Sequence, residues 1–296
     1  MIEKPGFGAR IFSTLNYTFL TLFALLCLMP FWIMVVASFT DDKALRQNGY
    51  LPWISKFSTV AYQWVFRGQE VQVGYEVTVF VTVVGTLGSL VAMSCLAYVM
   101  SLKRLRIRNV IALYVFLPMI FTAGIVPWFI IVRNVWGLKD NIQALILPMM
   151  LQPFWVFVLR NFFVALPSEI MESAYIDGAS DATILYRIVF PLSTPVLATV
   201  GLFMAVAYWN DWWLGVMLLD FAPFRPLSVL IMRMVNNAQN IMNAMKQPGV
   251  TIAAQSIPDL SIRMATAVIT IGPIILVYPF VQRYFVRGLT LGAIKG

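Results

Sequence analysis

None of the 296 residues is a histidine, so any chemistry in this chain must come from other side chains, with carboxylates, thiols and hydroxyls among them. The lack of imidazole excludes Ser-His catalysis and most zinc sites. No lysine is followed by serine or threonine, so the sequence lacks a Walker A phosphate-binding loop. The 16 methionines have no histidine or clustered cysteine beside them, which favours core packing over copper transport. The sequence therefore argues against an enzyme.

The most structured polar stretch is PSEIMESAYIDGASDATILYRIVFPLSTP, residues 167–195, which lies between two long apolar runs. It predicts two short helices that meet at a turn. Ser168 and Ser180 are the expected N-caps, and Asp177 with Gly178 ends the first helix, because glycine takes a positive φ without steric cost. The second helix is expected to carry an apolar stripe of Ile184, Leu185, Ile188 and Val189 and to end at Pro191. Such a segment is either a platform for another protein or an interfacial helix on lipid headgroups.

The elements that position this stretch are membrane helices. With 60% hydrophobic residues, 11% charged residues and a mean hydropathy of +0.81, the chain cannot cover a soluble globule with polar surface. The net charge of +8 comes from 21 lysines and arginines that are mostly scattered singly. Such cations anchor membrane helices, so no nucleic-acid partner is expected. Cys27 and Cys95 lie inside apolar runs, where thiols are usually buried hydrophobes. The fold class is therefore all-α and integral to the membrane.

Six apolar runs are long enough to cross the bilayer, which takes roughly 20 helical residues. They are Tyr17–Phe39, Val77–Leu102, Asn109–Val132, Asn141–Leu159, Ser193–Leu219 and Met264–Gln282. The third holds Pro118, Gly124 and Pro127, which predict a kink. Four cations within six residues, Lys103 to Arg108, assign that short loop to the cytoplasm. Both termini and residues 167–195 are then expected on the cytoplasmic side.

The polar stretch resembles the EAA loop of ABC importer permeases. The matching positions are Glu172, Ser173, Ala174, Asp177, Gly178, Ala179, Ile188 and Pro191, with Ser173 where alanine is usual. The last residues, YPFVQRYFVRGLTLGAIKG, are similar to the tail of carbohydrate-uptake permeases such as the smaller permease of maltose importers. GLKDN at 137–141, WND at 209–211 and SIP at 256–258 are similar to the branch that imports oligosaccharides of complex polysaccharides.

The resemblance implies one permease domain over residues 1–296, in the bacterial cytoplasmic (inner) membrane. It implies six transmembrane helices of the type I ABC importer fold. The other segments it implies are a coupling loop with a coupling helix at 160–192, an extracytoplasmic loop at 220–263 and a cytoplasmic tail at 283–296.

The implied partners are an ATPase dimer that binds ATP and magnesium, a homologous second permease, an extracytoplasmic solute-binding protein and an oligosaccharide. No cofactor is expected in this chain. In the coupling loop, Glu172 would offer a carboxylate to the ATPase, Gly178 would make the turn that enters its cleft, and Ala174 and Ala179 would pack closely. The tail residues Gly292, Lys295 and Gly296 would make a second ATPase contact; a frayed chain end is the alternative.

Two further features bear on transport. Asp211 is the one acid inside a predicted span, and with Trp209 and Asn210 it forms either a surface for sugar hydroxyls and rings or an aromatic belt at the outer interface. In the second span, Gly85 and Ser89 form a small-xxx-small face for close packing. The long outer segment 220–263 either docks the binding protein or caps the bundle. Alginate is one acidic candidate substrate, attracted by outer cations over about 8 Å.

The competing function is a self-contained, ion-coupled secondary transporter. Such proteins usually show two related halves and acids within the membrane. The sequence shows no internal repeat and a single intramembrane acid. An ATP-driven permease therefore explains the sequence better.

Overall fold

The computed structural model describes residues 7–67, 69–233, 236 and 260–273. The chain divides into two compact units, Met1–Gln69 with Arg233–Gly272, and Glu70–Met232 with Pro273–Gly296. Apart from one isolated bridge between Thr40 and Phe57, the regular structure of the described residues is helical. This agrees with the expected all-α class.

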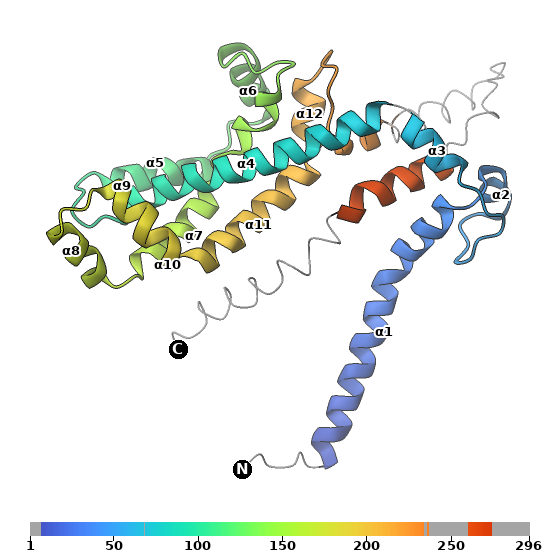
Figure 1. Ribbon diagram of the computed structural model, residues 1–296, viewed down its shortest axis with the longest axis horizontal. Coiled ribbons are helices and arrows are strands. Elements are labelled where there is room, and N and C mark those ends of the chain that lie inside the picture. The colour runs from blue at the N-terminus through green and yellow to red at the C-terminus, as the bar shows by residue number, and fades with distance from the viewer. Residues whose placement is uncertain (1–6, 68, 234–235, 237–259, 274–296) are drawn as a thin grey trace. The chain divides into compact units, whose positions relative to one another are not determined.

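The first unit contains α1 (Phe7–Ser38), α2 (Asp42–Asn48), α3 (Val60–Arg67) and the helix Leu260–Pro273 (Figure 1). The apolar side chains along most of α1 are exposed in the single chain, as expected of a helix that faces lipid or another helix. The Asp42 carboxylate accepts hydrogen bonds from the backbone nitrogens of Leu260 and Ser261, at 2.8 and 3.2 Å. Asp42 thereby satisfies two free donors at the start of that helix.

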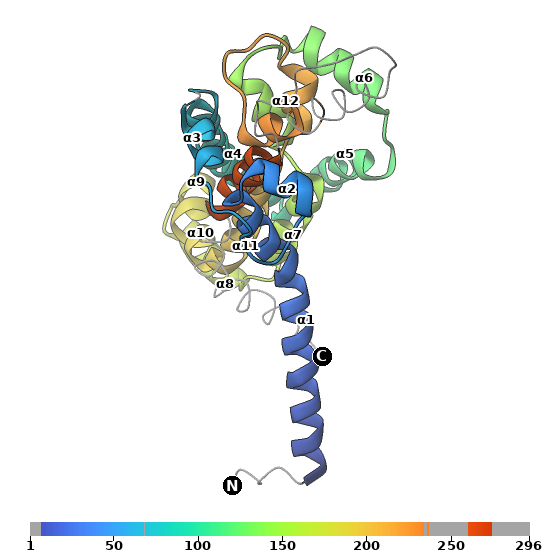
Figure 2. The same ribbon diagram turned by 90° about the vertical axis from the view of Figure 1, so that its right-hand side faces the viewer.

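The second unit is a helical bundle. Its longer helices are α4 (Gln69–Ser101), α5 (Arg108–Ile120), α7 (Pro153–Val164) and α11 (Thr194–Asn210). Shorter elements are α6 (Ile125–Ile130), the π-helix η1 (Ile131–Val135), the 3-10 helices η2 (Ile142–Leu145) and η3 (Leu147–Met149), and α12 (Trp213–Leu218). Between α7 and α11 come α8 (Ser168–Ile176), α9 (Asp181–Ile184), the π-helix η4 (Leu185–Val189) and α10 (Phe190–Leu192). In Figures 1 and 2, α4 and α11 lie side by side and α8–α10 lie at one end of the bundle.

The contact between α4 and α11 depends on the predicted close-approach face. A Cβ atom on Gly85 would lie 2.7 Å from the ring of Tyr208, a separation that real structures do not show. The Tyr208 hydroxyl is held in place by Ser89 Oγ and by the Ile146 carbonyl, each at 3.0 Å. Gly85 and Ser89 therefore receive a buried tyrosine, which joins α4, α11 and the segment before α7.

Gly85→Ala should lower the stability of the protein. The added methyl group must displace a ring anchored by two hydrogen bonds, and overpacking of this kind costs about 1 to 3 kcal/mol. Gly88→Ala is the matched control on the same helix, because its Cβ would meet only the terminal methyl of Met150, at 3.1 Å. Both variants replace a glycine within a helix by alanine, and this replacement alone stabilises the helix by up to about 1 kcal/mol. The comparison between the two variants cancels this contribution. The midpoint of thermal unfolding in detergent should fall for Gly85→Ala relative to Gly88→Ala; equal midpoints would contradict this account of the packing.

Three of the predicted spans are not continuous helices. The third is broken rather than kinked, since α5 and the helix Ile125–Val135 make an angle of 118°. Between them the chain is not helical, and Gly124 has φ +87°. The interruption lies between Pro118 and Pro127, where the sequence predicted a kink, but the bend is larger than that of a kinked helix.

The fourth and fifth spans also depart from the expectation. The fourth begins as two 3-10 helices, which meet α7 at 51°. Proline at positions 148 and 153 lacks the N–H that an uninterrupted α-helix would use. The fifth ends as a helix at Asn210 and restarts as α12.

In the described residues, two helices are long and apolar enough to cross a membrane unbroken, Ile11–Ser38 and Gln69–Ser101. Up to five spans result if each bent pair counts as one. The expected sixth span, Met264–Gln282, is described only as far as Pro273.

Candidate functional site

The turn between α8 and α9 is a Schellman motif, in which the backbone closes a helix through two characteristic hydrogen bonds. Ala179 N donates to the Ala174 carbonyl at 2.9 Å, and Gly178 N donates to the Tyr175 carbonyl at 3.1 Å. Gly178 takes φ +78°, as predicted. A Cβ on Gly178 would meet nothing within 4 Å. Within this chain the glycine is therefore needed for its backbone conformation and not for space.

Of the two N-cap residues predicted from the sequence, only one is an N-cap in the structure. Ser180 is an N-cap as expected, because its Oγ accepts a hydrogen bond from Thr183 N at 3.3 Å. Ser168 is not an N-cap. It is the first residue of α8, Pro167 occupies the cap position, and no side chain caps the helix. Helix ends fray and are defined only to within one or two residues, and the difference at Ser168 is of that size.

We call the segment Ser168–Ile184 the elbow. The residues expected to couple to an ATPase lie on both sides of its turn. Glu172, Asp177 and Gly178 are exposed on it, and Pro191, farther along, is also exposed. Ala174 is buried in the hydrophobic core of the chain, and Ala179 and Ile188 are half-buried against that core. The small side chain of Ala174 thus serves internal packing here.

Ile176 is a surface residue that the sequence did not single out. Its side chain is 86% exposed, at the end of α8 beside the exposed Asp177. The sequence did contain a signal for this exposure, because the isoleucine directly precedes the Asp-Gly pair that ends the helix. Together with Glu172 it gives the tip of the elbow both apolar and acidic character.

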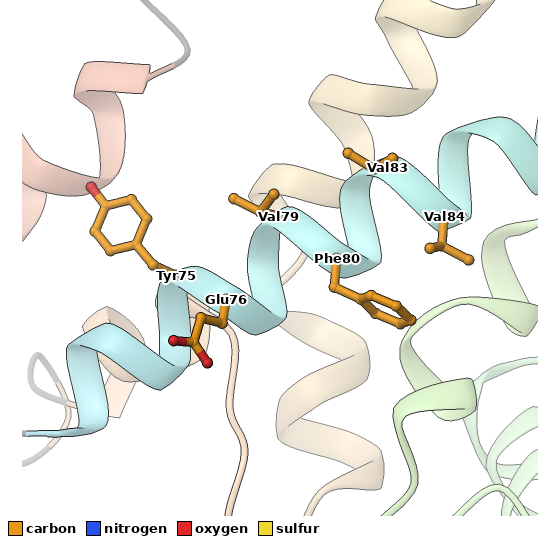
Figure 3. A pocket seen from close by; sticks show the side chains of 6 residues that line it. All are labelled: Tyr75, Glu76, Val79, Phe80, Val83 and Val84. Carbon is orange, nitrogen blue, oxygen red and sulfur yellow. The ribbon is translucent and has the colours of Figure 1, made fainter.

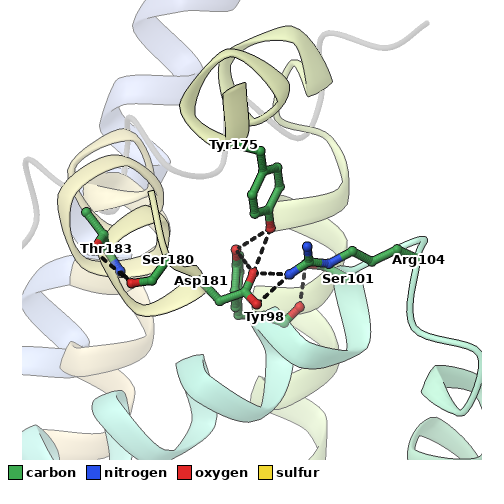
Figure 4. Close-up of polar contacts among 7 residues, drawn as sticks. All are labelled: Tyr98, Ser101, Arg104, Tyr175, Ser180, Asp181 and Thr183. Carbon is green, nitrogen blue, oxygen red and sulfur yellow. Dashed lines mark hydrogen bonds and ion pairs between the residues drawn. The ribbon is translucent and has the colours of Figure 1, made fainter. Parts of the chain in front are cut away.

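A polar cluster joins the elbow to the end of α4 and to the loop after it (Figure 4). The Asp181 carboxylate accepts hydrogen bonds from the Tyr175 hydroxyl at 2.7 Å and from the Tyr98 hydroxyl at 3.3 Å. The Arg104 guanidinium bonds to both oxygens of the same carboxylate. It also lies over the ring of Tyr175, with its central carbon 4.5 Å from the ring centroid. These four residues were not among the predicted site residues.

Burial raises the pKa of the Tyr175 phenol above its usual value of 10.0, although its hydrogen bond with Tyr98 acts in the opposite direction. The phenol is therefore protonated at neutral pH. Its hydroxyl can therefore donate the hydrogen bond that the geometry shows to the Asp181 carboxylate.

A second polar cluster lies between GLKDN and the segment after α12. Asp140, with φ 49°, accepts hydrogen bonds from the backbone nitrogens of Phe221 and Ala222, at 2.8 and 3.1 Å. Asp220 pairs with Arg133 and Lys139. The hydrogen bond from Arg133 holds the pKa of Asp220 below its usual 3.8. The pairing therefore contributes above about pH 4 and is lost only as the pH falls through the lowered pKa.

The predicted substrate-path residues occupy the break between α11 and α12. Trp209 is nearly buried, whereas Asn210 is exposed and donates from its amide to the Val206 carbonyl at 2.9 Å. The Asp211 carboxylate accepts a hydrogen bond from Leu214 N at 3.4 Å, and its backbone carbonyl accepts one from Ser228 Oγ at 2.6 Å. Asp211 thus ends α11, and its carboxylate accepts a backbone N–H from the first turn of α12, whose N-cap position is occupied by Trp212.

Aromatic rings line the same break. Trp213 contacts Trp128, with ring centroids 4.5 Å apart, and Trp212 is 43% exposed. The cluster therefore offers indole faces beside an amide and a carboxylate. The tail residues Gly292, Lys295 and Gly296, with most of the 220–263 loop, lie outside the described residues.

A shallow groove of about 560 Å³ lies on one face of α4 (Figure 3). It is lined by Tyr75, Glu76, Val79, Phe80, Val83 and Val84. A sugar site needs several convergent polar groups, and this face supplies one carboxylate and one phenol. It suits contact with lipid or another helix better than contact with a carbohydrate.

Comparisons with known proteins agree with the sequence resemblance. The chain is 37% identical over 287 residues to the polygalacturonan/rhamnogalacturonan transport system permease protein YtcP of Bacillus subtilis, covering 97% of this chain and 99% of that one. It is 27% identical to the arabinooligosaccharides transport system permease protein AraQ of Halalkalibacterium halodurans, covering 96% and 95% of the two chains. No protein-family model matches the chain.

A solved structure is similar along nearly the whole chain. It is the crystal structure of a bacterial ABC transporter involved in the import of the acidic polysaccharide alginate, with a TM-score of 0.82 and 29% identity over 95% of this chain and 98% of that one. The 37% identity to a sugar permease over nearly the full length, together with the similar fold, identifies the family of this chain. The chain belongs to the family of carbohydrate-uptake ABC transporter permeases.

Proposed function

We propose that this chain is one of two permease subunits of an importer that carries oligosaccharides into a bacterial cell. A separate ATPase dimer binds ATP and magnesium and hydrolyses the nucleotide, and an extracytoplasmic binding protein delivers the sugar. The chain crosses the inner membrane six times, with both termini in the cytoplasm. Its own role is mechanical, because motion of the ATPase opens and closes a path between the helices.

The observation that carries this proposal is the exposed tip of the elbow. Glu172, Ile176 and Asp177 project from a helix end that the Schellman turn holds in a defined shape. Open space surrounds the Gly178 position. An apolar side chain flanked by carboxylates fits an apolar cleft with a basic rim, which is the surface we assign to the ATPase. Pro191 and the half-buried Ala179 and Ile188 complete this face.

We assign the substrate path to Trp209, Asn210 and Asp211. A helix break within an apolar span is tolerated where protein or water satisfies the freed backbone groups. Here the break brings a carboxylate, an amide and indole rings together. Carboxylates and amides accept hydrogen bonds from sugar hydroxyls, and indole faces contact sugar rings.

Two further contacts belong to the proposal. The 220–263 loop docks the binding protein, and Gly292, Lys295 and Gly296 of the 283–296 tail touch the ATPase. As for the cargo, similar proteins are named for galacturonan, arabinooligosaccharide and alginate transport. Two of these names refer to uronate polymers, so acidic oligosaccharides are the first substrates to test, with those of alginate among them.

The test is purification of the chain from its native membrane, followed by reconstitution of whatever binds to it. We expect an ATPase chain and a second permease to co-purify in stable amounts. ATP hydrolysis should rise several-fold, on the order of coupling between distant sites, when binding protein loaded with galacturonate oligosaccharides is added. An arabinooligosaccharide serves as the neutral comparison. Uptake by the purified chain alone, driven by an ion gradient without ATP, would contradict the proposal and support a secondary transporter.

A further inference from the structure

The cluster around Asp181 joins two stretches of the chain that are remote in sequence, 98–104 and 175–181. Tyr98 lies in the last turn of α4, Arg104 lies in the following loop, and Tyr175 and Asp181 lie on the two arms of the elbow. The ion pair spans 77 residues of sequence. Without it, the elbow is joined to the bundle by its chain connections and by the packing of its inner face.

The contacts of Asp181 go beyond an ordinary surface ion pair. Exposed pairs contribute little, typically under about 1 kcal/mol. Here one carboxylate accepts from a guanidinium at both oxygens and from two phenols, and the guanidinium also stacks on one of those rings. A network of several hydrogen bonds to one carboxylate fixes geometry as well as charge. Asp181 is also the first residue of its helix, where the helix dipole favours an anion.

We propose that the Asp181 cluster, formed by Tyr98, Arg104, Tyr175 and Asp181, is a latch that transmits movement of the elbow to α4. The inference rests on the proposed function, because it assumes that an ATPase moves the elbow. The elbow also continues into α11, but the helix Asp181–Leu192 meets α11 at a bend of 85°. A bend is a point where motion can be absorbed. The latch adds a direct attachment to the unbroken helix α4.

A physical route leads from α4 to the proposed substrate path. Gly85 and Ser89 of α4 hold the side chain of Tyr208. Tyr208 directly precedes Trp209, Asn210 and Asp211. Displacement of α4 by the latch therefore acts on the residue beside the helix break. Tyr98, Arg104, Tyr175 and Asp181 are positioning residues in this scheme, and none of them touches the sugar.

The test uses the complete complex in proteoliposomes, with binding protein and galacturonate oligosaccharide as the probe. The measured quantity is sugar transported per ATP hydrolysed. Arg104→Glu and Asp181→Arg should each lower this ratio about fivefold, which is the lower end of coupling between distant sites, while ATPase binding and basal hydrolysis persist. The double variant Arg104→Glu with Asp181→Arg restores opposite charges and should recover at least about half of the ratio.

Arg106→Glu is the matched control. Arg106 lies in the same loop, is exposed, and makes no ion pair in the part of the chain that the structure describes. It should transport as the wild type does. Should the charge reversals prevent assembly, Tyr175→Phe removes the hydrogen bonds of this hydroxyl with Asp181 and Tyr98 without introducing repulsion, and it should still lower the ratio by about twofold.

The outcomes separate the two proposals. A wild-type complex without an ATPase overturns the proposed function. A coupled wild-type complex whose ratio is the same in Arg104→Glu, Asp181→Arg and Tyr175→Phe overturns the latch alone. A loss that the double reversal does not recover at all, with normal assembly, also counts against the latch.

Discussion

Glu172→Lys is expected to lower sugar uptake about a hundredfold while the protein inserts and assembles normally in the membrane. Glu172 is exposed on α8, close to the tip that we assign to the ATPase. Reversal of its charge places a cation against the basic rim proposed there. Disruption of a buried charge pair at an interface costs about 2 to 5 kcal/mol, so transport should fall by about a hundredfold. The assay is uptake into proteoliposomes that contain the whole complex, with ATP hydrolysis followed in parallel.

Two further variants show whether the expected loss of transport depends on position 172 itself or only on the net charge of the elbow. Glu172→Gln keeps the shape and removes the charge, so its loss should be smaller than that of Glu172→Lys. Glu169→Lys places the same new charge in the first turn of the same helix. It should retain transport within about threefold, since a surface charge at a helix end contributes only about 0.3 to 1 kcal/mol. Equal losses at positions 169 and 172 would mean that the general charge of the elbow matters and that Glu172 has no specific partner.

Asp211→Asn is expected to reduce transport about tenfold without loss of the folded complex. Asparagine caps helices about as well as aspartate, so the start of α12 should survive. A charged acceptor forms stronger hydrogen bonds than an amide, about 1.5 to 3 kcal/mol against about 1 kcal/mol. The difference is about tenfold in affinity for sugar hydroxyls. Uptake kinetics should be measured with the sugar that stimulates ATP hydrolysis most.

Asp211→Ala separates the two roles of this acid. It removes both the hydrogen bond from Leu214 N in the first turn of α12 and the acceptor for the sugar, so the midpoint of thermal unfolding should fall, by an amount that reflects about 1 kcal/mol for the lost hydrogen bond. Transport should fall at least as far as in Asp211→Asn. If Asp211→Asn transports several sugars with wild-type kinetics, the acid serves only as a helix cap, and the tryptophans around it form an interfacial belt.

Much of the elbow was predictable because its signals are local. An Asp-Gly pair after an amphipathic turn predicts a helix stop, and the glycine at 178 takes the expected positive φ. The serine at 180 caps the next helix, also as expected. Side-chain caps and left-handed glycines depend on a few neighbouring residues, which the sequence displays directly. Composition likewise predicted a helical membrane protein, since it measures how little polar surface is available.

Local signals of this kind could not predict how the helices break within the spans. The apolar runs from 109 to 132 and from 141 to 159 lack a periodic pattern, because residues facing lipid and residues facing other helices are equally apolar. Proline and glycine mark where a helix is weak, but they do not tell whether it bends slightly or by 118°. That choice depends on which neighbours satisfy the freed backbone groups.

The sequence by itself determined the class of the molecule, the position of the elbow in the chain and the turn that shapes it. The tertiary structure decided which residues meet: Arg104 with Asp181, Gly85 with Tyr208, and Ala174 with the core instead of the surface. The physical reason is distance along the chain. Local hydrogen bonds and composition act within a few residues, whereas these contacts join segments tens of residues apart and arise only when the helices pack.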